Sequence, residues 1–179
     1  GLASFCRGCE EQRPERAHHC RTCGACILRM DHHCPWVGNC VGINNHKFFI
    51  LMCFYTSVAG TFYAASALPT VVKIMAGRQS SLDPNDPVVL MLIIASTFAS
   101  SLGLSTAGLF FTHVSLAWCN RTTIEAGYKG KSPYSLGPKR NFEQVFGVLS
   151  ATWLFPVPPL RKVTDGLRFQ TSLSPGDAV

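Results

Sequence analysis

Two long runs without a charged residue dominate the hydrophobic pattern of the chain. They cover residues 48–72 and 88–118 and contain no Asp, Glu, Lys or Arg. An α-helix rises about 1.5 Å per residue and the hydrocarbon core of a bilayer is about 30 Å thick, so about 20 apolar residues cross it. Both runs exceed this length, and each predicts a transmembrane helix. Two buried helices of a soluble protein are the alternative, but covering them would take a far larger protein.

Small residues in both runs favour close packing of the two helices in lipid. They are Gly60 in the first run and, in the second, Gly103, Ser105 and Gly108. Pro69, near the end of the first run, predicts a kink or the end of the helix. The second run is long enough for its end, near His113, to leave the membrane, and the sequence suggests no partner for this histidine.

The basic residues predict the topology. Six Lys or Arg lie in the segment that ends at Lys47, eight follow Cys119, and two lie in the loop of residues 73–87. The positive-inside rule therefore places both termini in the cytosol and the loop on the far side, with turn residues at positions 83–87. A cytosolic position would leave the glycosylation sequon that begins at Asn120 unused.

Cysteine and histidine are concentrated before the first run. Seven of the nine cysteines and four of the six histidines lie between Cys6 and Cys40. Because the cytosol is reducing, metal binding or catalysis is expected here rather than disulfides. Repeated Cys-x2-Cys pairs with nearby histidines are typical of tetrahedral zinc sites. The pattern reads Cys6-x2-Cys9, His18-His19-Cys20-x2-Cys23-x2-Cys26, Asp31-His32-His33-Cys34 and Cys40.

The number of ligands mildly favours one free cysteine, since two tetrahedral sites with three cysteines and one histidine each leave one of the seven over. In an extended stretch His32 and Cys34 face the same side and His33 the other. His33 can then bind metal while His32 acts as base to Cys34, and Asp31 can orient His32 if a turn brings it there. On spacing alone, further zinc-ligand material is an equally good interpretation.

Segments in the order of the chain complete the pattern. Asp31-His32-His33-Cys34 with Pro35-Trp36 resembles the signature of the DHHC family of protein S-acyltransferases (palmitoyltransferases). The resemblance covers roughly residues 5–155 and continues through Cys40-Val41-Gly42, Asn44 or Asn45, Lys47-Phe48-Phe49, the TTxE-like Thr122-Thr123-Ile124-Glu125, and Asn141-Phe142 with Val145-Phe146-Gly147.

The resemblance implies two interleaved zinc sites that fold the segment before the first run and present Cys34. Their ligands would be Cys6, Cys9, His19 and Cys26 in one site, and Cys20, Cys23, His33 and Cys40 in the other. It also implies Cys34 as nucleophile, His32 as base and Asp31 as the group that orients His32. The residues expected to support the active site or the C-terminal segment are Thr122, Thr123, Glu125 and Asn141.

The fold class expected is a mostly α integral membrane protein, in which two transmembrane helices carry a small zinc-clamped, cysteine-rich cytosolic module of short β-hairpins and loops. The expected segments are the cysteine-rich module (1–47), a transmembrane helix (48–72), a lumenal or extracellular loop (73–87), a transmembrane helix with a cytosolic extension (88–118), and a cytosolic C-terminal region (119–179). The tail from Arg161 onward has no recognisable pattern and is expected to be flexible.

The implied reaction moves a long-chain fatty acyl group, such as palmitoyl, from acyl-CoA to Cys34 and then to a cysteine of a substrate protein. Zinc, acyl-CoA, the bilayer of the Golgi, ER or plasma membrane, and proteins with juxtamembrane cysteines would be the partners. Arg13, Arg16 and His18 could pair with CoA phosphates, although a basic face toward anionic lipid explains any one of them equally well. Trp36 could pack beside the thioester or anchor at the membrane interface.

Two other functional classes are less well supported. A non-catalytic, membrane-anchored zinc module for protein interaction needs neither the complete Asp-His-His-Cys motif nor the downstream motifs. A zinc-type nucleic-acid binder is suggested by the net charge of +6, but the apolar runs and the lack of an Arg/Lys-rich recognition helix argue against it. Family members usually have four spans, with the module between the second and third, so the chain is expected to be a fragment or a truncated relative.

Overall fold

The computed structural model describes residues 4–78 and 86–172. It divides into two compact units. The first unit comprises Gly1–Leu51 and Thr112–Val179, and the second comprises Met52–Phe111. The residues expected to carry the chemistry all lie in the first unit.

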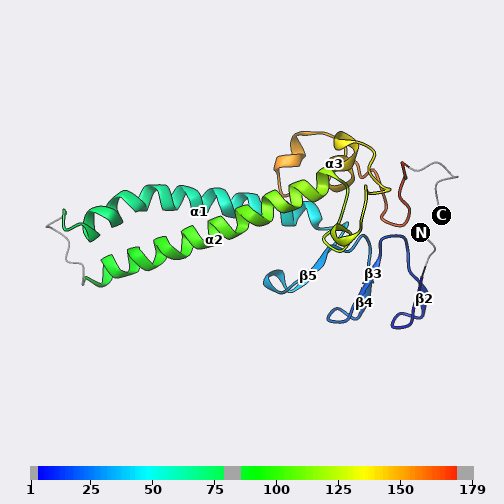
Figure 1. The fold of residues 1–179 in the computed structure, drawn as a ribbon, viewed down its shortest axis with the longest axis horizontal. Coiled ribbons are helices and arrows are strands. Elements are labelled where there is room, and N and C mark those ends of the chain that lie inside the picture. The colour runs from blue at the N-terminus through cyan, green and yellow to red at the C-terminus, as the bar shows by residue number, and fades with distance from the viewer. Residues whose placement is uncertain (1–3, 79–85, 173–179) are drawn as a thin grey trace. The chain divides into compact units, whose positions relative to one another are not determined.

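Three antiparallel β-hairpins form the N-terminal part of the first unit, and Figure 1 shows them in succession along the chain. Their strands are β1 (Phe5–Cys6) with β2 (Glu11–Gln12), β3 (His18–Cys20) with β4 (Ala25–Ile27), and β5 (His32–Cys34) with β6 (Asn39–Val41). The hairpins expected from the sequence are confirmed. Strands of two or three residues bury little apolar surface, so such a segment depends on cross-links such as metal ions.

The hairpins are three copies of one unit, each displaced by 14 residues along the sequence. The copies of the cysteine that ends the first strand are Cys6, Cys20 and Cys34. Four residues after each, the chain takes a left-handed conformation, with φ of 56° at Glu10, 65° at Gly24 and 59° at Gly38. Glycine is favoured there because it has no Cβ to clash in this conformation.

Two long helices follow, α1 (His46–Met75) and α2 (Pro87–Trp118), and both are long and apolar enough to cross a membrane. α1 continues through Pro69 to Met75, so this proline does not end the helix. α2 begins at Pro87, which suits a first helical position because proline has no N–H to leave unpaired. The Asp86 carboxylate accepts a hydrogen bond from the Val88 N–H at 2.8 Å and caps this end. The predicted turn at 83–87 lies largely outside the described residues.

In the second unit, α1 and α2 run side by side (Figure 1) and approach closely at two glycines. A Cβ on Gly60 would lie 2.8 Å from the Gly103 Cα, so a larger residue at position 60 would force the backbones apart. The predicted small-residue contact is therefore confirmed for this pair, whereas nothing lies within 4 Å of a Cβ built on Gly108. Large apolar side chains such as Phe62 and Leu104 are exposed on the outside of the helix pair.

The C-terminal part of the first unit contains α3 (Pro138–Phe146) and the short 3₁₀ helices η2 (Glu125–Gly127) and η3 (Ala151–Leu154). Asn141 of α3 is buried and bonds three residues. Its amide donates to the Trp118 carbonyl at 2.7 Å and to the Ser135 hydroxyl at 3.0 Å, and its Oδ1 accepts from the Leu136 N–H at 2.8 Å. Asn141 thus ties the end of α2 to the loop before α3.

The segment from Arg161 to Ser172 is held by backbone hydrogen bonds, so the expectation of a flexible tail is wrong for these residues. The Arg161 carbonyl accepts from the Val148 N–H at 3.1 Å, and the Ser172 N–H donates to the Pro133 carbonyl at 2.8 Å. The Phe169 N–H also donates to the Glu15 carboxylate at 3.1 Å. Residues 173–179 lie outside the described residues.

Candidate functional site

Two clusters of four cysteine and histidine ligands connect successive hairpins. Each takes a Cys-x2-Cys pair from the end of one hairpin's first strand and its turn, and a histidine and a cysteine from the next hairpin. These last two face each other across the strands, because His19 pairs with Cys26 and His33 with Cys40. The clusters are Cys6, Cys9, His19 and Cys26, and Cys20, Cys23, His33 and Cys40.

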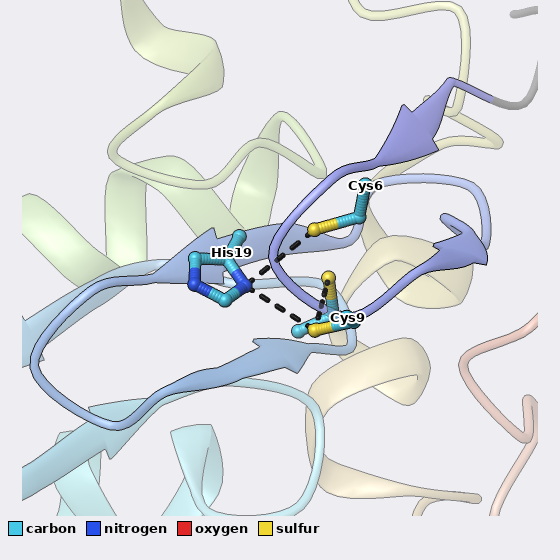
Figure 2. A group of neighbouring side chains, drawn as sticks. Cys6, Cys9 and His19 are labelled. Carbon is cyan, nitrogen blue, oxygen red and sulfur yellow. Dashed lines mark hydrogen bonds between the residues drawn. The ribbon is translucent and has the colours of Figure 1, made fainter.

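The first cluster has the dimensions of a tetrahedral zinc site. Figure 2 shows the His19 ring directed at the sulfurs of Cys6 and Cys9. Its Nδ1 lies 3.5 Å from Cys6 Sγ and 3.3 Å from Cys9 Sγ, and Cys9 Sγ lies 3.6 Å from Cys26 Sγ. Ligands on one tetrahedral zinc ion would be about 3.6 Å apart for N and S and about 3.8 Å for two sulfurs, given the usual bond lengths. The residues therefore fit the ion.

The second cluster repeats these dimensions. His33 Nδ1 lies 3.6 Å from Cys20 Sγ, 3.4 Å from Cys23 Sγ and 3.6 Å from Cys40 Sγ. Cys23 Sγ and Cys40 Sγ are 3.6 Å apart. Thiolates and an imidazole in this arrangement are the donor set that zinc prefers in structural sites. The first zinc site would link the first hairpin to the second, and the second site would link the second hairpin to the third.

Cys34 occupies, in the third hairpin, the place that Cys6 and Cys20 occupy in the first two. Val37 stands where those hairpins have their second cysteine, Cys9 and Cys23. Burial raises the pKa of the Cys34 thiol, but hydrogen bonds from the backbone N–H groups of Val37 and Trp36 and from His32 outweigh it, so the pKa lies below its usual value. A lowered pKa favours the thiolate, which is the nucleophilic form.

Buried Asp31 and half-buried His32 form a pair beside this cysteine. His32 Nδ1–H donates to Asp31 Oδ2 at 2.7 Å, which leaves Nε2 as the base. Burial raises the pKa of Asp31, but hydrogen bonds from His32 and Thr123 outweigh it and hold the pKa well below its usual range. The hydrogen bond to Asp31 in turn raises the pKa of His32. The alternation of side chains along an extended strand did not by itself predict this contact between Asp31 and His32.

The TTxE-like segment contacts the hairpins at two points. Thr123 donates to Asp31 twice, from its N–H to Oδ1 at 2.9 Å and from its hydroxyl to Oδ2 at 2.7 Å. Glu125 accepts two hydrogen bonds from the Arg16 guanidinium, both at 2.7 Å, and one from the Thr122 N–H at 3.0 Å. Thr122 Oγ1 accepts from the Glu125 N–H at 3.3 Å. The segment therefore positions the proposed catalytic carboxylate directly.

Arg29, His46 and His113 form a buried group beside Asp31 that the sequence did not single out. The Arg29 guanidinium lies 3.0 Å from His46 Nδ1 and donates to Asn120 Oδ1 at 3.2 Å. His46 Nε2 lies 3.2 Å from His113 Nδ1. Spacing along the sequence carries no signal for these contacts, because they join residues 17, 67 and 91 positions apart. Asn120 is fully buried, which agrees with an unused sequon.

A basic pocket of about 620 Å³ lies in the first unit, between the hairpin segment and the C-terminal region. Arg13, Arg16 and His18 line it, as do four basic residues that the sequence did not single out, Arg121, Lys129, Lys131 and Arg168. The Arg16 side chain is almost fully buried and pairs with Glu125, so it forms a wall of the pocket. Burial lowers the pKa of His18. Trp36 does not line the pocket, and 95% of its surface is exposed.

Comparisons with known proteins place these features in one family. A family model described as DHHC palmitoyltransferase matches residues 2–129, and the chain belongs to this family. It is 41% identical over 155 residues to "Probable protein S-acyltransferase 13" of Arabidopsis thaliana, which is 86% of this chain and 51% of that protein. "Palmitoyltransferase ZDHHC20-B" of Danio rerio is 39% identical over 180 residues (97% and 54%), and "Palmitoyltransferase ZDHHC20" of Homo sapiens is 37% identical over 177 (94% and 47%). The chain spans about half the length of these curated relatives.

Proposed function

We propose that this chain carries the catalytic centre of a protein S-acyltransferase, which moves a long-chain acyl group such as palmitoyl from acyl-CoA to protein cysteines. The observation that carries the proposal is the Asp31–His32 pair, joined at 2.7 Å beside Cys34 and outside both zinc-type clusters. Membership of the DHHC family and the names of the relatives support the same activity.

In the first half-reaction, Cys34 Sγ attacks the thioester carbonyl carbon of acyl-CoA while His32 Nε2 takes the thiol proton. Asp31 holds Nδ1–H and stabilises the imidazolium that forms. The tetrahedral intermediate collapses, the bond from the carbonyl carbon to the CoA sulfur breaks, and the CoA thiolate takes the proton from His32. The products are the Cys34 acyl-enzyme and CoA thiol.

In the second half-reaction, a cysteine of the substrate protein repeats these steps on the acyl-enzyme. His32 takes the proton of the incoming thiol, the new sulfur attacks the carbonyl carbon, and Cys34 leaves as a thiolate that recovers the proton. One thioester is broken and one is made in each half, so no oxidant or external energy source is required. A thiolate is a good leaving group, which suits exchange between thiols.

Zinc would have a structural role. Each cluster offers four protein ligands and so leaves no open coordination position for a substrate. The two ions, when bound, would supply the stability that the short strands lack. Cys34 then lies at the end of a hairpin that is fixed at His33 and Cys40.

We further propose that α1 and α2 cross the membrane of the Golgi, the ER or the plasma membrane, with the cysteine-rich module and the C-terminal region in the cytosol. Cys34 precedes the start of α1 at His46 by 12 residues, which favours a position near the cytosolic interface. A fatty acyl chain gains about 0.8 kcal/mol per buried CH₂ and therefore partitions into the bilayer. Substrate cysteines would need to lie close to the membrane, and the exposed Trp36 suits the interface.

The basic pocket is our candidate for the CoA phosphates. Arg13 and His18 would contact the phosphates together with Lys129 and Lys131, all of which line it. Arg16 would contribute positive charge from the wall while remaining paired with Glu125. We expect no nucleic-acid partner.

Incubation of the zinc-loaded protein in lipid nanodiscs with labelled palmitoyl-CoA tests the proposal. Wild type should acquire hydroxylamine-labile label, and Cys34→Ser should acquire none while still binding two zinc ions per chain. Label that persists on Cys34→Ser would exclude Cys34 as the nucleophile. A folded protein that binds two zinc ions but takes no label would instead support the non-catalytic, membrane-anchored zinc module.

A zinc count on the same preparation tests the structural metal sites. A folded protein without zinc would refute them, whatever its activity.

A further inference from the structure

Four buried charges lie in or near the proposed catalytic pair, two positive and two negative: one is Asp31 itself. Asp31 and Arg29 are fully buried, and the Arg16 and Glu125 side chains are 1% and 9% exposed. Arg16 has a direct partner in Glu125, whereas Arg29 forms no ion pair with a carboxylate of the described residues. The nearest link from Arg29 to the charge of Asp31 runs through His46, whose Nε2 lies 3.9 Å from Asp31 Oδ1.

Arg29 determines which nitrogen of His46 carries the proton. Burial and the charge of Arg16 lower the pKa of Arg29 to about 9, which leaves it protonated at neutral pH. A guanidinium can only donate hydrogen bonds, so His46 Nδ1, at 3.0 Å, must accept. The proton of the neutral imidazole then lies on Nε2, which is 3.2 Å from His113 Nδ1.

The same reasoning continues to His113. Since His46 Nε2–H donates, His113 Nδ1 must accept, and the proton of His113 lies on its Nε2. The opposite tautomer of His46 would place its Nδ1–H against the donors of Arg29 and a lone pair of Nε2 toward the carboxylate of Asp31. Because Arg29 donates to its Nδ1, His46 presents the Nε2–H, and not a lone pair, to Asp31 and His113.

This proton arrangement argues against a third metal site. Asp31, His46 and His113 offer ligand atoms within 4.8 Å of one another, as a metal site would. A metal ion would need the lone pair of His46 Nε2, and His46 would then carry its proton on Nδ1, opposite Arg29. The hydrogen-bonded arrangement satisfies both nitrogens of His46, and the metal arrangement does not.

We propose that Arg29, His46 and His113 are positioning residues that hold Asp31 and His32 in the arrangement needed to activate Cys34, an inference that rests on the proposed acyltransferase function. His113 lies beside the His32 ring at 5.8 Å between centroids, and Phe49 packs edge-on against both His32 at 5.1 Å and His113 at 4.9 Å. A fixed His113 therefore limits rotation of His32 away from Cys34.

The first test compares two variants of His113, one that keeps a hydrogen-bond acceptor at the position of Nδ1 and one that has none. The Oδ1 of His113→Asn falls near the position of Nδ1, whereas His113→Leu has similar bulk and no acceptor. We expect His113→Leu to slow the rate of Cys34 acylation about tenfold, the usual effect of one buried hydrogen bond, and His113→Asn to remain within about threefold of wild type. The matched control is Ser105→Leu, an exposed position two turns earlier on α2.

Either a His113→Leu rate equal to wild type or a His113→Asn rate as low as that of His113→Leu would overturn the proposal. A third metal ion per chain, lost in His113→Leu and kept in Ser105→Leu, would identify a metal centre instead. If wild type takes no label, or if Cys34→Ser is labelled, the acyltransferase function itself fails. In that case ¹⁵N NMR of labelled histidines still decides the network, since it predicts His46 and His113 protonated at Nε2 alone, and a proton on His46 Nδ1 would refute it.

Discussion

At the scale of single residues, the proposed nucleophile Cys34 stands at a position that holds a candidate zinc ligand in each of the other two hairpins. Cys34 ends a strand as Cys6 and Cys20 do, and backbone N–H groups from the following turn reach its sulfur as they reach the sulfur of Cys20. In a zinc site those N–H groups stabilise a metal-bound thiolate. At Cys34 the same groups would stabilise a thiolate that is free to react, with His32 as the proposed base.

Replacing Asp31 by Asn should lower the rate of Cys34 acylation by about 10³- to 10⁴-fold. The Asn amide would present a donor where His32 Nδ1 now finds an acceptor, so His32 would place its proton on Nε2 and lose its function as base. The measurement is single-turnover labelling with palmitoyl-CoA. Asp31→Asn should still bind two zinc ions, and a rate within tenfold of wild type would contradict the role assigned to Asp31.

Substitution of Thr123 tests the same Asp31 carboxylate by removing only one of its hydrogen bonds. Thr123→Val removes the hydroxyl donor to Asp31 Oδ2 but keeps the backbone N–H donor to Oδ1. Loss of one hydrogen bond to a charged group costs about 1.5–3 kcal/mol, so we expect acylation to slow about 10- to 100-fold. Thr123→Ser retains the hydroxyl and should stay near wild type. Equal rates for the Val and Ser variants would show that the hydroxyl has no effect.

At the scale of elements, the hairpin is the repeated unit and zinc is its proposed cross-link. The 14-residue step sets the cross-strand pairs His19–Cys26 and His33–Cys40, and it places Cys-x2-Cys in the turns of the first two hairpins. The third copy departs from the pattern at Val37, Lys47 and Phe54, which stand where a second cysteine, a histidine and a third cysteine would be. These three departures leave Cys34 without the partners of the other two ligand sets.

Val37→Cys should therefore turn the third hairpin into a metal-sensitive one. The new pair, Cys34 and the substituted position 37, would have the spacing of the first two pairs and could bind added zinc with His32 nearby. We expect acylation of this variant to fall at least tenfold on addition of micromolar zinc and to recover with a mild chelator. Val37→Ser is the control and should be insensitive to the added metal. Insensitivity of Val37→Cys would show that the repeat does not extend to the geometry of the third turn.

At the scale of the whole chain, local residue spacing predicted the secondary structure and the candidate nucleophile, but it could not predict contacts between residues far apart in the sequence. The Cys-x2-Cys spacing, the apolar runs and the Asp-His-His-Cys motif led to the hairpins, the long helices and the candidate nucleophile. The contacts from Thr123 to Asp31 and from Glu125 to Arg16 join residues 92 and 109 positions apart. Periodicity and spacing describe neighbours in the sequence, so they contain no information on such pairs. In the sequence His113 is only a polar residue near the end of an apolar run, and its contact with His46 is visible in the fold alone.

The Arg16–Glu125 pair joins the hairpin segment to the C-terminal region, so its loss should affect stability more than local chemistry. Glu125→Ala would leave the Arg16 guanidinium buried without its carboxylate, which costs about 3–5 kcal/mol for a buried pair. We expect a lower melting temperature for the zinc-loaded protein in detergent. Burial raises the pKa of Glu125, but the hydrogen bonds and charge of Arg16 outweigh it, so the pKa lies below its usual value. The stabilisation from this pair is therefore complete at neutral pH, and it is lost as the pH falls through the lowered pKa of Glu125.

The double variant Arg16→Met/Glu125→Leu separates the ion pair from general packing. Apolar residues of similar size remove both buried charges together, so this protein should melt closer to wild type than Glu125→Ala does. It should also bind CoA more weakly if Arg16 contributes charge to the basic pocket, whereas Glu125→Ala should not weaken that binding. A Glu125→Ala melting temperature equal to that of wild type would mean that Asn120, which accepts from Arg16 at 3.1 Å through both its side chain and its backbone, is a sufficient partner alone. The joint between the two segments would then be a hydrogen-bonded one.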